Sequence, residues 1–197
     1  MNDLPLFPLR TVLFPGGLLP LRIFEPRYVD MVSRCMREGG EFGVLLITDG
    51  TSAETGAIGS LAGIGTTARV VDFHTLPDGL LGLMCRGARR FRLLSRRTQD
   101  DGLHLGNVAW LPEPALSALR AEHAPLARVL RRVLQELGDT ARHLDAAYDE
   151  AGWVSWRLAE FLPLERSAQQ ELLELDDPQA RMEVLAPLIE VPPEAGG

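Results

Sequence analysis

Up to about residue 112, hydrophobic residues occur in short runs separated by Gly and Pro. Runs of this length, bounded by turn-forming residues, are typical of β-strands. Pro8 and Pro20 interrupt two of the runs and favour sheet edges or bulges there. Residues 48–63, rich in Gly, Ser, Thr and Ala, are expected to form a loop. The pattern predicts strands over residues 4–9, 18–24, 42–47, 64–76, 80–86, 89–96 and 103–110.

One helix is expected among these strands. Pro26 suits its first turn and Gly39 its end. Between them, apolar residues recur at helical spacing at Tyr28, Val32, Cys35 and Met36. Several antiparallel strands with one helix predict a small, partly closed β-barrel. Turns are expected where Gly, Pro and Asp gather, at residues 14–17, 77–79 and 100–102.

After Pro114 the composition changes to Ala, Leu, Arg and Glu, which favours helices. Asp177 and Pro178 suit a helix cap and first turn, and Pro163 should end the helix before it. The sequence therefore predicts an α+β protein with a β-barrel subdomain over 1–112 and a helical bundle over 113–197. The expected helices are 115–137, 144–162, 165–175 and 178–190.

The two predicted subdomains also differ in charge. All basic residues are arginine, because the sequence contains no lysine. Residues 1–112 hold twelve arginines against eleven acidic residues, whereas residues 113–197 hold eight against sixteen. The formal net charge is −7. Without lysine, a phosphate-binding P-loop, a Ser–Lys dyad and Schiff-base chemistry are all excluded.

An arginine-rich stretch over residues 86–97 is the one local excess of positive charge. Phe91 and Leu93 should lie on one face of this strand, with Arg90 and Arg92 on the other. One interpretation is an RNA-binding strand. The alternative is a solvated strand face paired with Asp100 and Asp101 nearby, which the acidic charge of the whole chain favours.

Signals for other chemistry are weak. The four histidines are scattered, no G-x-S-x-G occurs, and Cys35 and Cys85 lie far apart in apolar patterns. We therefore expect no metal, no cofactor, no disulfide and no enzyme activity, although a Ser–His–acid triad assembled by folding stays open. The sequence shows neither a signal peptide nor an apolar run long enough to span a bilayer. A cytoplasmic bacterial protein is the expectation.

A series of short motifs follows in order along the chain. These are LPLFPLR at 4–10, VLFPG at 12–16, LPL at 19–21, FEPRY at 24–28, IGTTARV at 64–70, LPDG at 76–79 and Arg86-Gly87. Together with the tail at 172–185, they resemble the N-terminal, substrate-binding domain of Lon-type ATP-dependent proteases and its stand-alone relatives. The resemblance covers nearly the whole chain.

The resemblance implies a PUA-like β-barrel followed by a helical bundle. It also implies a substrate-recognition module whose partners are unfolded or extended protein segments, or another protein. The ATPase and peptidase parts of a full protease are not expected in these 197 residues. PUA-like barrels in other families bind RNA, so RNA binding through residues 86–97 is the alternative function.

Four residues in the resembling motifs are candidates for binding: Arg10, Glu25, Arg27 and Tyr28. The first three are charges set among apolar residues, so they either pair with one another to hold the first strands against the helix or border a groove for a peptide. Phe7, Phe14, Phe24 and Tyr28 are expected in the core. A crevice is expected where the barrel meets the helices, because such junctions commonly hold binding sites.

Overall fold

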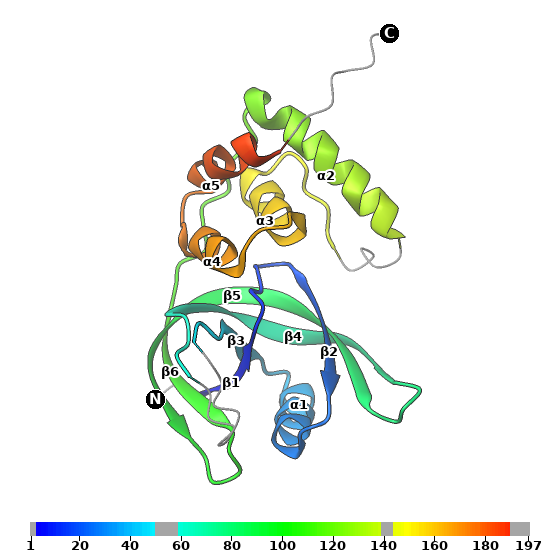
Figure 1. The fold of residues 1–197 in the computed structure, drawn as a ribbon, viewed down its shortest axis with the longest axis vertical. Coiled ribbons are helices and arrows are strands. Elements are labelled where there is room, and N and C mark those ends of the chain that lie inside the picture. The colour runs from blue at the N-terminus through cyan, green and yellow to red at the C-terminus, as the bar shows by residue number, and fades with distance from the viewer. Residues whose placement is uncertain (1–2, 50–58, 139–143, 190–197) are drawn as a thin grey trace.

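The computed structural model describes residues 3–49, 59–138 and 144–189. In Figure 1 the strands and one helix form the lower part of the molecule, and the remaining helices form the upper part. The strands are β1 (Asp3–Leu9), β2 (Leu18–Ile23), β3 (Phe42–Leu46), β4 (Ile64–Thr75), β5 (Leu81–Thr98) and β6 (His104–Trp110). The helices are α1 (Pro26–Glu38), α2 (Ala124–Leu137), α3 (Ala151–Phe161), α4 (Arg166–Glu174) and α5 (Pro178–Leu185).

The strands form one mixed sheet in the order β2-β5-β4-β3-β1-β6. Because β6 also pairs with β5, the pairings of β5, β4, β3, β1 and β6 close on themselves. The expectation of a wholly antiparallel sheet is wrong at one pair, since β1 and β3 run parallel. Between them the chain passes through β2 and α1, a connection long enough to return it in the same direction.

The prolines of the first two strands have different positions in this sheet. Pro20 lies on β2, which ends the strand order and pairs with β5, so an edge is confirmed there. Pro8 lies on β1, which pairs with β3 on one side and β6 on the other. The described pairing with β6 spans Asp3 to Leu6 and ends before Pro8, so Pro8 is paired only with Leu45 of β3 and has the edge position expected for it.

Helix α1 begins and ends where the sequence predicted. Pro26 stands in its first turn, and Gly39 ends it in the left-handed region at φ 66°, a conformation that Gly adopts without strain. Its buried face consists of Tyr28, Met31, Val32 and Cys35. Met36 shares the helical spacing but is 42% exposed, and Met31 is buried in the helix face instead. The buried face packs with strands β1 to β6 in a core that includes Phe7, Phe42, Leu83 and Cys85.

The two strands predicted over 80–86 and 89–96 are one continuous strand, β5. Gly87 lies in its middle, where the turn at residues 14–17 approaches the strand. Its N–H donates to the Gly17 carbonyl at 2.8 Å, and its own carbonyl accepts from the Gly16 N–H at 2.8 Å. A Cβ at position 87 would lie 2.1 Å from the Phe14 carbonyl oxygen, so only glycine permits this approach.

Two predicted helices are shorter than expected, and short segments near their predicted starts pair with each other instead. Residues 117–119 run extended beside residues 149–151, with an isolated bridge between Ala118 and Glu150. The Leu119 N–H donates to the Asp149 carbonyl at 2.8 Å. Helix α2 therefore begins at Ala124 and α3 at Ala151, whereas α4 and α5 lie within the ranges predicted for them. Helices α2 to α5 pack around Leu130, Val154, Trp156, Leu173 and Met182.

Among the described residues, no helix is long and apolar enough to cross a membrane. Within the same residues, no group of three or more His, Cys, Asp or Glu side chains is placed to hold a metal ion. Of the loop expected over 48–63, residues 50–58 lie outside the described residues.

Candidate functional site

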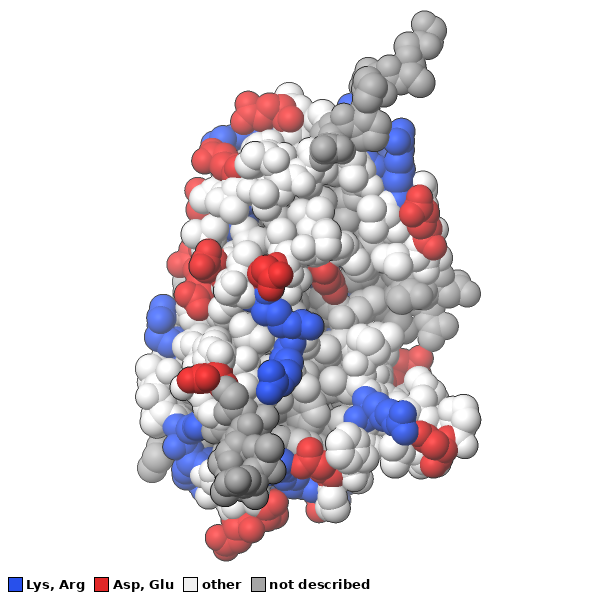
Figure 2. Space-filling view, viewed as in Figure 1, with Lys and Arg blue, Asp and Glu red and all other residues white. Residues whose placement is uncertain are grey.

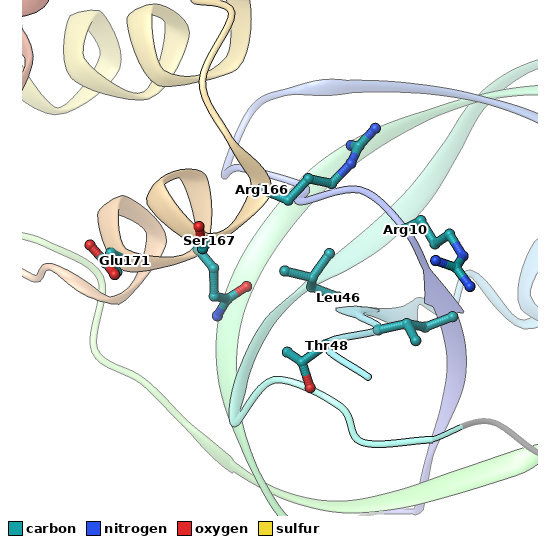
Figure 3. Close-up of a pocket in the computed structure, with 8 residues that line it drawn as sticks. Arg10, Leu46, Thr48, Arg166, Ser167 and Glu171 are labelled. Carbon is teal, nitrogen blue, oxygen red and sulfur yellow. The ribbon is translucent and has the colours of Figure 1, made fainter. Parts of the chain in front are cut away.

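A cleft of about 500 Å³ opens where the strands meet the helices. Its volume is within the range of ligand-binding pockets. One wall comes from the ends of β1 and β3, and the other from α4 (Figure 3). The lining residues are Arg10, Leu46, Ile47 and Thr48 on the strand side, and Arg166, Ser167, Gln170 and Glu171 on the helix side.

The strand side of the cleft is fixed by backbone hydrogen bonds. The Ile47 N–H donates to the Leu9 carbonyl at 2.8 Å, and the Thr48 N–H donates to the Ser60 carbonyl at 3.0 Å. Leu46 is buried and Ile47 half-buried, so they form an apolar floor. The floor is therefore formed before any ligand arrives.

Gln170 attaches the helix side to the sheet. Its Nε2 donates to the Ile64 carbonyl at 3.0 Å and to Glu174 Oε1 at 2.8 Å. Its side-chain oxygen Oε1 is buried without a hydrogen-bond partner, and the residue is 8% exposed. A buried acceptor that lacks a donor is unfavourable, and a ligand N–H could satisfy it.

The first turn of α4 borders the same cleft. Its N-cap residue, Glu165, makes no side-chain capping hydrogen bond, and the first turn contains no acidic residue. The first N–H groups of a helix have no partner within the helix and carry a partial positive charge. Arg166 is exposed, and its side chain makes no hydrogen bond or ion pair within the described part of the chain.

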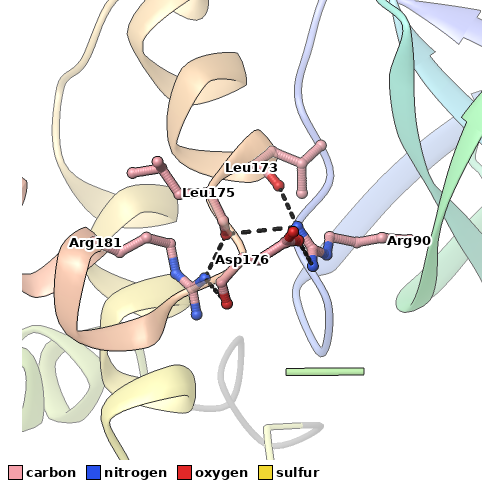
Figure 4. Close-up of polar contacts among 5 residues, drawn as sticks. All are labelled: Arg90, Leu173, Leu175, Asp176 and Arg181. Atoms are coloured by element: carbon pink, nitrogen blue, oxygen red, sulfur yellow. Dashed lines mark hydrogen bonds and ion pairs between the residues drawn. The ribbon is translucent and has the colours of Figure 1, made fainter. Parts of the chain in front are cut away.

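Two arginines hold the other end of α4 (Figure 4). Arg90 of β5 donates through Nη1 to the Leu173 carbonyl at 2.9 Å and through Nη2 to Asp176 Oδ1 at 2.6 Å. Arg181 of α5 donates through Nη1 to the Leu175 carbonyl at 2.6 Å. These carbonyls belong to the last turn of α4 and its cap, where cationic donors are favoured. Arg90 thus connects the sheet directly to the helix that forms the cleft wall.

The predicted solvation of Arg90 is wrong, because the residue is 3% exposed. On the opposite face of β5, Phe91 packs in a small core with Leu4, Leu6, Leu45 and Val108. The helices cover the Arg90 face, so both sides of the strand are buried at this point. Alternation along the strand separates the two faces correctly but does not show that a helix covers the polar one.

A second buried arginine joins α3 to the turn before β2. Arg157 is fully buried, donates through Nη2 to the Pro15 carbonyl at 2.9 Å, and places Nε 2.9 Å from Glu160 Oε2. Glu160 Oε1 accepts from the Leu18 N–H at 3.0 Å. Burial raises the pKa of Glu160, while the Arg157 charge and the Leu18 N–H oppose that shift. The sequence gave no signal for these contacts, because Arg157 and Glu160 lie 142 residues from their backbone partners Pro15 and Leu18.

The four predicted binding residues lie in two places. Arg10 is exposed and lines the cleft. Glu25, Arg27 and Tyr28 meet instead at the start of α1. Arg27 Nη2 lies 2.6 Å from Glu25 Oε2, Arg27 Nη1 donates to the Gly102 carbonyl at 2.8 Å, and the guanidinium carbon lies 4.8 Å from the centre of the Tyr28 ring. These contacts join α1 to the β5–β6 turn.

The predicted aromatic core is confirmed at three positions and wrong at one. Phe7, Phe14 and Tyr28 are buried. Phe24 is 66% exposed, because it follows the last residue of β2 and precedes the helix cap. The motif around it therefore contributes Tyr28 to the core and leaves Phe24 at the surface.

Four other arginines of β5 contact residues elsewhere in the fold. Arg86 pairs with Asp145 at 2.6 Å and Arg97 with Asp3 at 2.7 Å. Arg96 donates to the Gly59 carbonyl at 3.0 Å, and Arg89 lies over the Trp110 ring at 4.4 Å. The acidic partners of Arg86, Arg90 and Arg97 come from distant segments of the chain and not from the predicted Asp100 and Asp101.

Comparison with known proteins identifies the family and related structures of the same fold. The family described as the ATP-dependent protease La (LON) substrate-binding domain matches residues 3–191. The chain belongs to this Lon substrate-binding domain family. A crystal structure of a Lon N-terminal domain protein from Xanthomonas campestris is similar at 43% identity and a TM-score of 0.78, covering 96% of this chain and all of that one.

Other relatives share less sequence identity with this chain or match only part of their own length. The N-terminal domain of the Mycobacterium avium complex Lon protease shares the fold, with 17% identity and a TM-score of 0.64 over 94% of this chain and 97% of that one. The Lon protease of Paraburkholderia phytofirmans is 31% identical over 92% of this chain and 23% of its own length. Protein cereblon of Xenopus tropicalis is 32% identical over 58% of this chain and 25% of its own length. The chain thus spans about a quarter of the length of the Paraburkholderia and Xenopus relatives.

Proposed function

We propose that this member of the Lon substrate-binding domain family is a non-catalytic module that binds unfolded or extended protein segments in the cleft between β3 and α4. The observation that carries the proposal is the cleft itself, which pairs a rigid apolar floor with a polar helix wall in a chain of this family. An extended peptide commonly binds in an apolar groove of this kind.

The predicted binding residues have two different roles in this proposal, one in ligand contact and one in holding the fold. Arg10 contacts the bound segment at the cleft. Glu25, Arg27 and Tyr28 hold the start of α1, in line with their mutual contacts and the hydrogen bond to Gly102. The closed set of strand pairings supports a PUA-like barrel over residues 1–112 with the helical subdomain over 113–197.

The RNA-binding alternative receives less support from the arginines of β5. Arg86, Arg90 and Arg97 are each engaged with an acidic side chain, and Arg90 is buried. Nucleic-acid affinity rests on cations that are free to neutralise phosphates. Absence of catalysis is proposed because a chain without lysine cannot supply a P-loop or a Ser–Lys dyad.

The test measures binding of a fluorescently labelled unfolded protein, reduced and carboxymethylated α-lactalbumin, by fluorescence anisotropy. Ser167→Trp places an indole in the cleft from an exposed position and should weaken binding at least tenfold. Ser95→Trp, an exposed position on β5 outside the cleft, is the matched control and should leave binding unchanged. Equal loss in both variants, tight binding of single-stranded RNA, or no binding by the unaltered protein would overturn the proposal.

A further inference from the structure

We infer that the cleft recognises the carboxyl terminus of a protein segment, taking up the terminal α-carboxylate together with an apolar last side chain. This inference rests on the proposed function and specifies its ligand. It combines three features of the cleft: the distribution of its charges, its apolar floor and its unpartnered acceptor.

The charged residues divide the cleft into two ends. In Figure 3, Arg166 and Arg10 lie on one side of the cleft and Glu171 lies on the other. Figure 2 shows arginine side chains at mid-height of the molecule, between the helices above and the strands below. A guanidinium binds a carboxylate through two parallel N–H···O hydrogen bonds, and the uncapped first turn of α4 adds donors beside Arg166. An anionic group therefore fits the arginine end.

The floor favours a terminal residue over an internal acidic side chain. Leu46 and Ile47 line the same cleft as the arginines. A C-terminal residue presents a carboxylate and an apolar side chain from the same Cα, so it can fill both features at once. An Asp or Glu side chain supplies the carboxylate alone and would leave the apolar floor uncovered.

Gln170 supplies a hydrogen-bond acceptor on the helix side of the cleft. Its Oε1 is a buried acceptor without a donor, in a residue 8% exposed that lines the cleft. A bound peptide terminus carries a backbone N–H next to its carboxylate, and that N–H is the donor that Oε1 lacks. The wall thus offers an acceptor for the peptide amide and donors for its carboxylate.

The experiment compares labelled ten-residue peptides by fluorescence anisotropy. The first is built from Gly and Ser, ends in three leucines, and carries a free α-carboxylate. The second is the same peptide with an amidated end, and the third is amidated with one internal Gly replaced by Glu. The free acid should bind at least tenfold more tightly than either amide, and this preference should shrink with added salt.

Two arginine variants assign the preference to the cleft. Arg166→Gln should reduce the preference for the free acid to less than threefold, while Arg132→Gln, an exposed position on α2 outside the cleft, should leave it intact. Equal binding of the acid and the amide, equal binding of the Glu-containing amide, or an unchanged preference in Arg166→Gln would overturn the inference. In those cases binding of unfolded α-lactalbumin that is sensitive to Ser167→Trp would still support the proposed function.

Discussion

Replacing Arg90 by Ala tests whether the buried arginine of β5 holds α4 against the sheet. The substitution removes the donor to the Leu173 carbonyl and the ion pair with Asp176. It also removes the guanidinium that lies 5.7 Å from the centre of the Trp156 ring. Asp176 is exposed and can be hydrated after the change, whereas the Leu173 carbonyl loses a buried partner.

The expected loss of stability follows from these contacts. A buried carbonyl left without a donor costs about 1–3 kcal/mol, and an ion pair with an exposed partner adds about 0–1 kcal/mol. Loss of the cation–π contact and of side-chain packing adds roughly 1 kcal/mol. Relief of repulsion with Arg181, whose pKa is lowered to about 10 by burial and by the Arg90 charge, offsets part of the sum. We expect a net loss of about 3 kcal/mol.

The assay is urea unfolding followed by circular dichroism and tryptophan fluorescence. With a urea dependence of about 2 kcal/mol per molar, the midpoint should fall by about 1.5 M. Arg92→Ala is the matched control, because Arg92 is exposed on the same strand and should change stability by less than about 0.5 kcal/mol. If the two variants unfold at the same urea concentration, Arg90 does not join the sheet to α4 and the reasoning fails.

Two further predictions concern buried titratable groups. Burial raises the pKa of Glu160, so the folded protein binds the carboxyl proton more tightly than the unfolded chain does. The stability that results is fully present below pH 4.5, the ordinary pKa of a glutamate, and is lost as the pH rises through the pKa of the folded state. Urea titrations from about pH 4 to about pH 7 should therefore show a steeper fall of stability with pH in the unaltered protein than in Glu160→Gln, and parallel profiles would contradict this. Burial also raises the pKa of Cys85 to about 12. In a Cys35→Ser variant the Cys85 thiol should not react with Ellman's reagent at neutral pH until urea unfolds the protein, and rapid reaction in the native state would show that the thiol is accessible.

Much of the secondary structure follows from the sequence alone, because its signals are local. Pro26 and Gly39 bound α1 through constraints on their own backbone angles. Asp177 caps α5 through the Gln179 N–H two residues away, and Pro163 follows the end of α3. The family resemblance also rested on local motifs, and the match over residues 3–191 confirms it.

The tertiary structure decided which surfaces are covered. Alternation placed Arg90 on the polar face of β5, but only the packing of helices α3 and α4 near that face buries the residue. Helix propensity over 115–137 is overridden at its start, because residues 117–119 pair with residues 149–151. Arg10 and Arg166 line one cleft although 156 positions separate them. Burial and the cleft depend on contacts between segments far apart in the chain, whereas turns, caps and periodicity depend on neighbours within a few residues, and a single sequence shows only the latter.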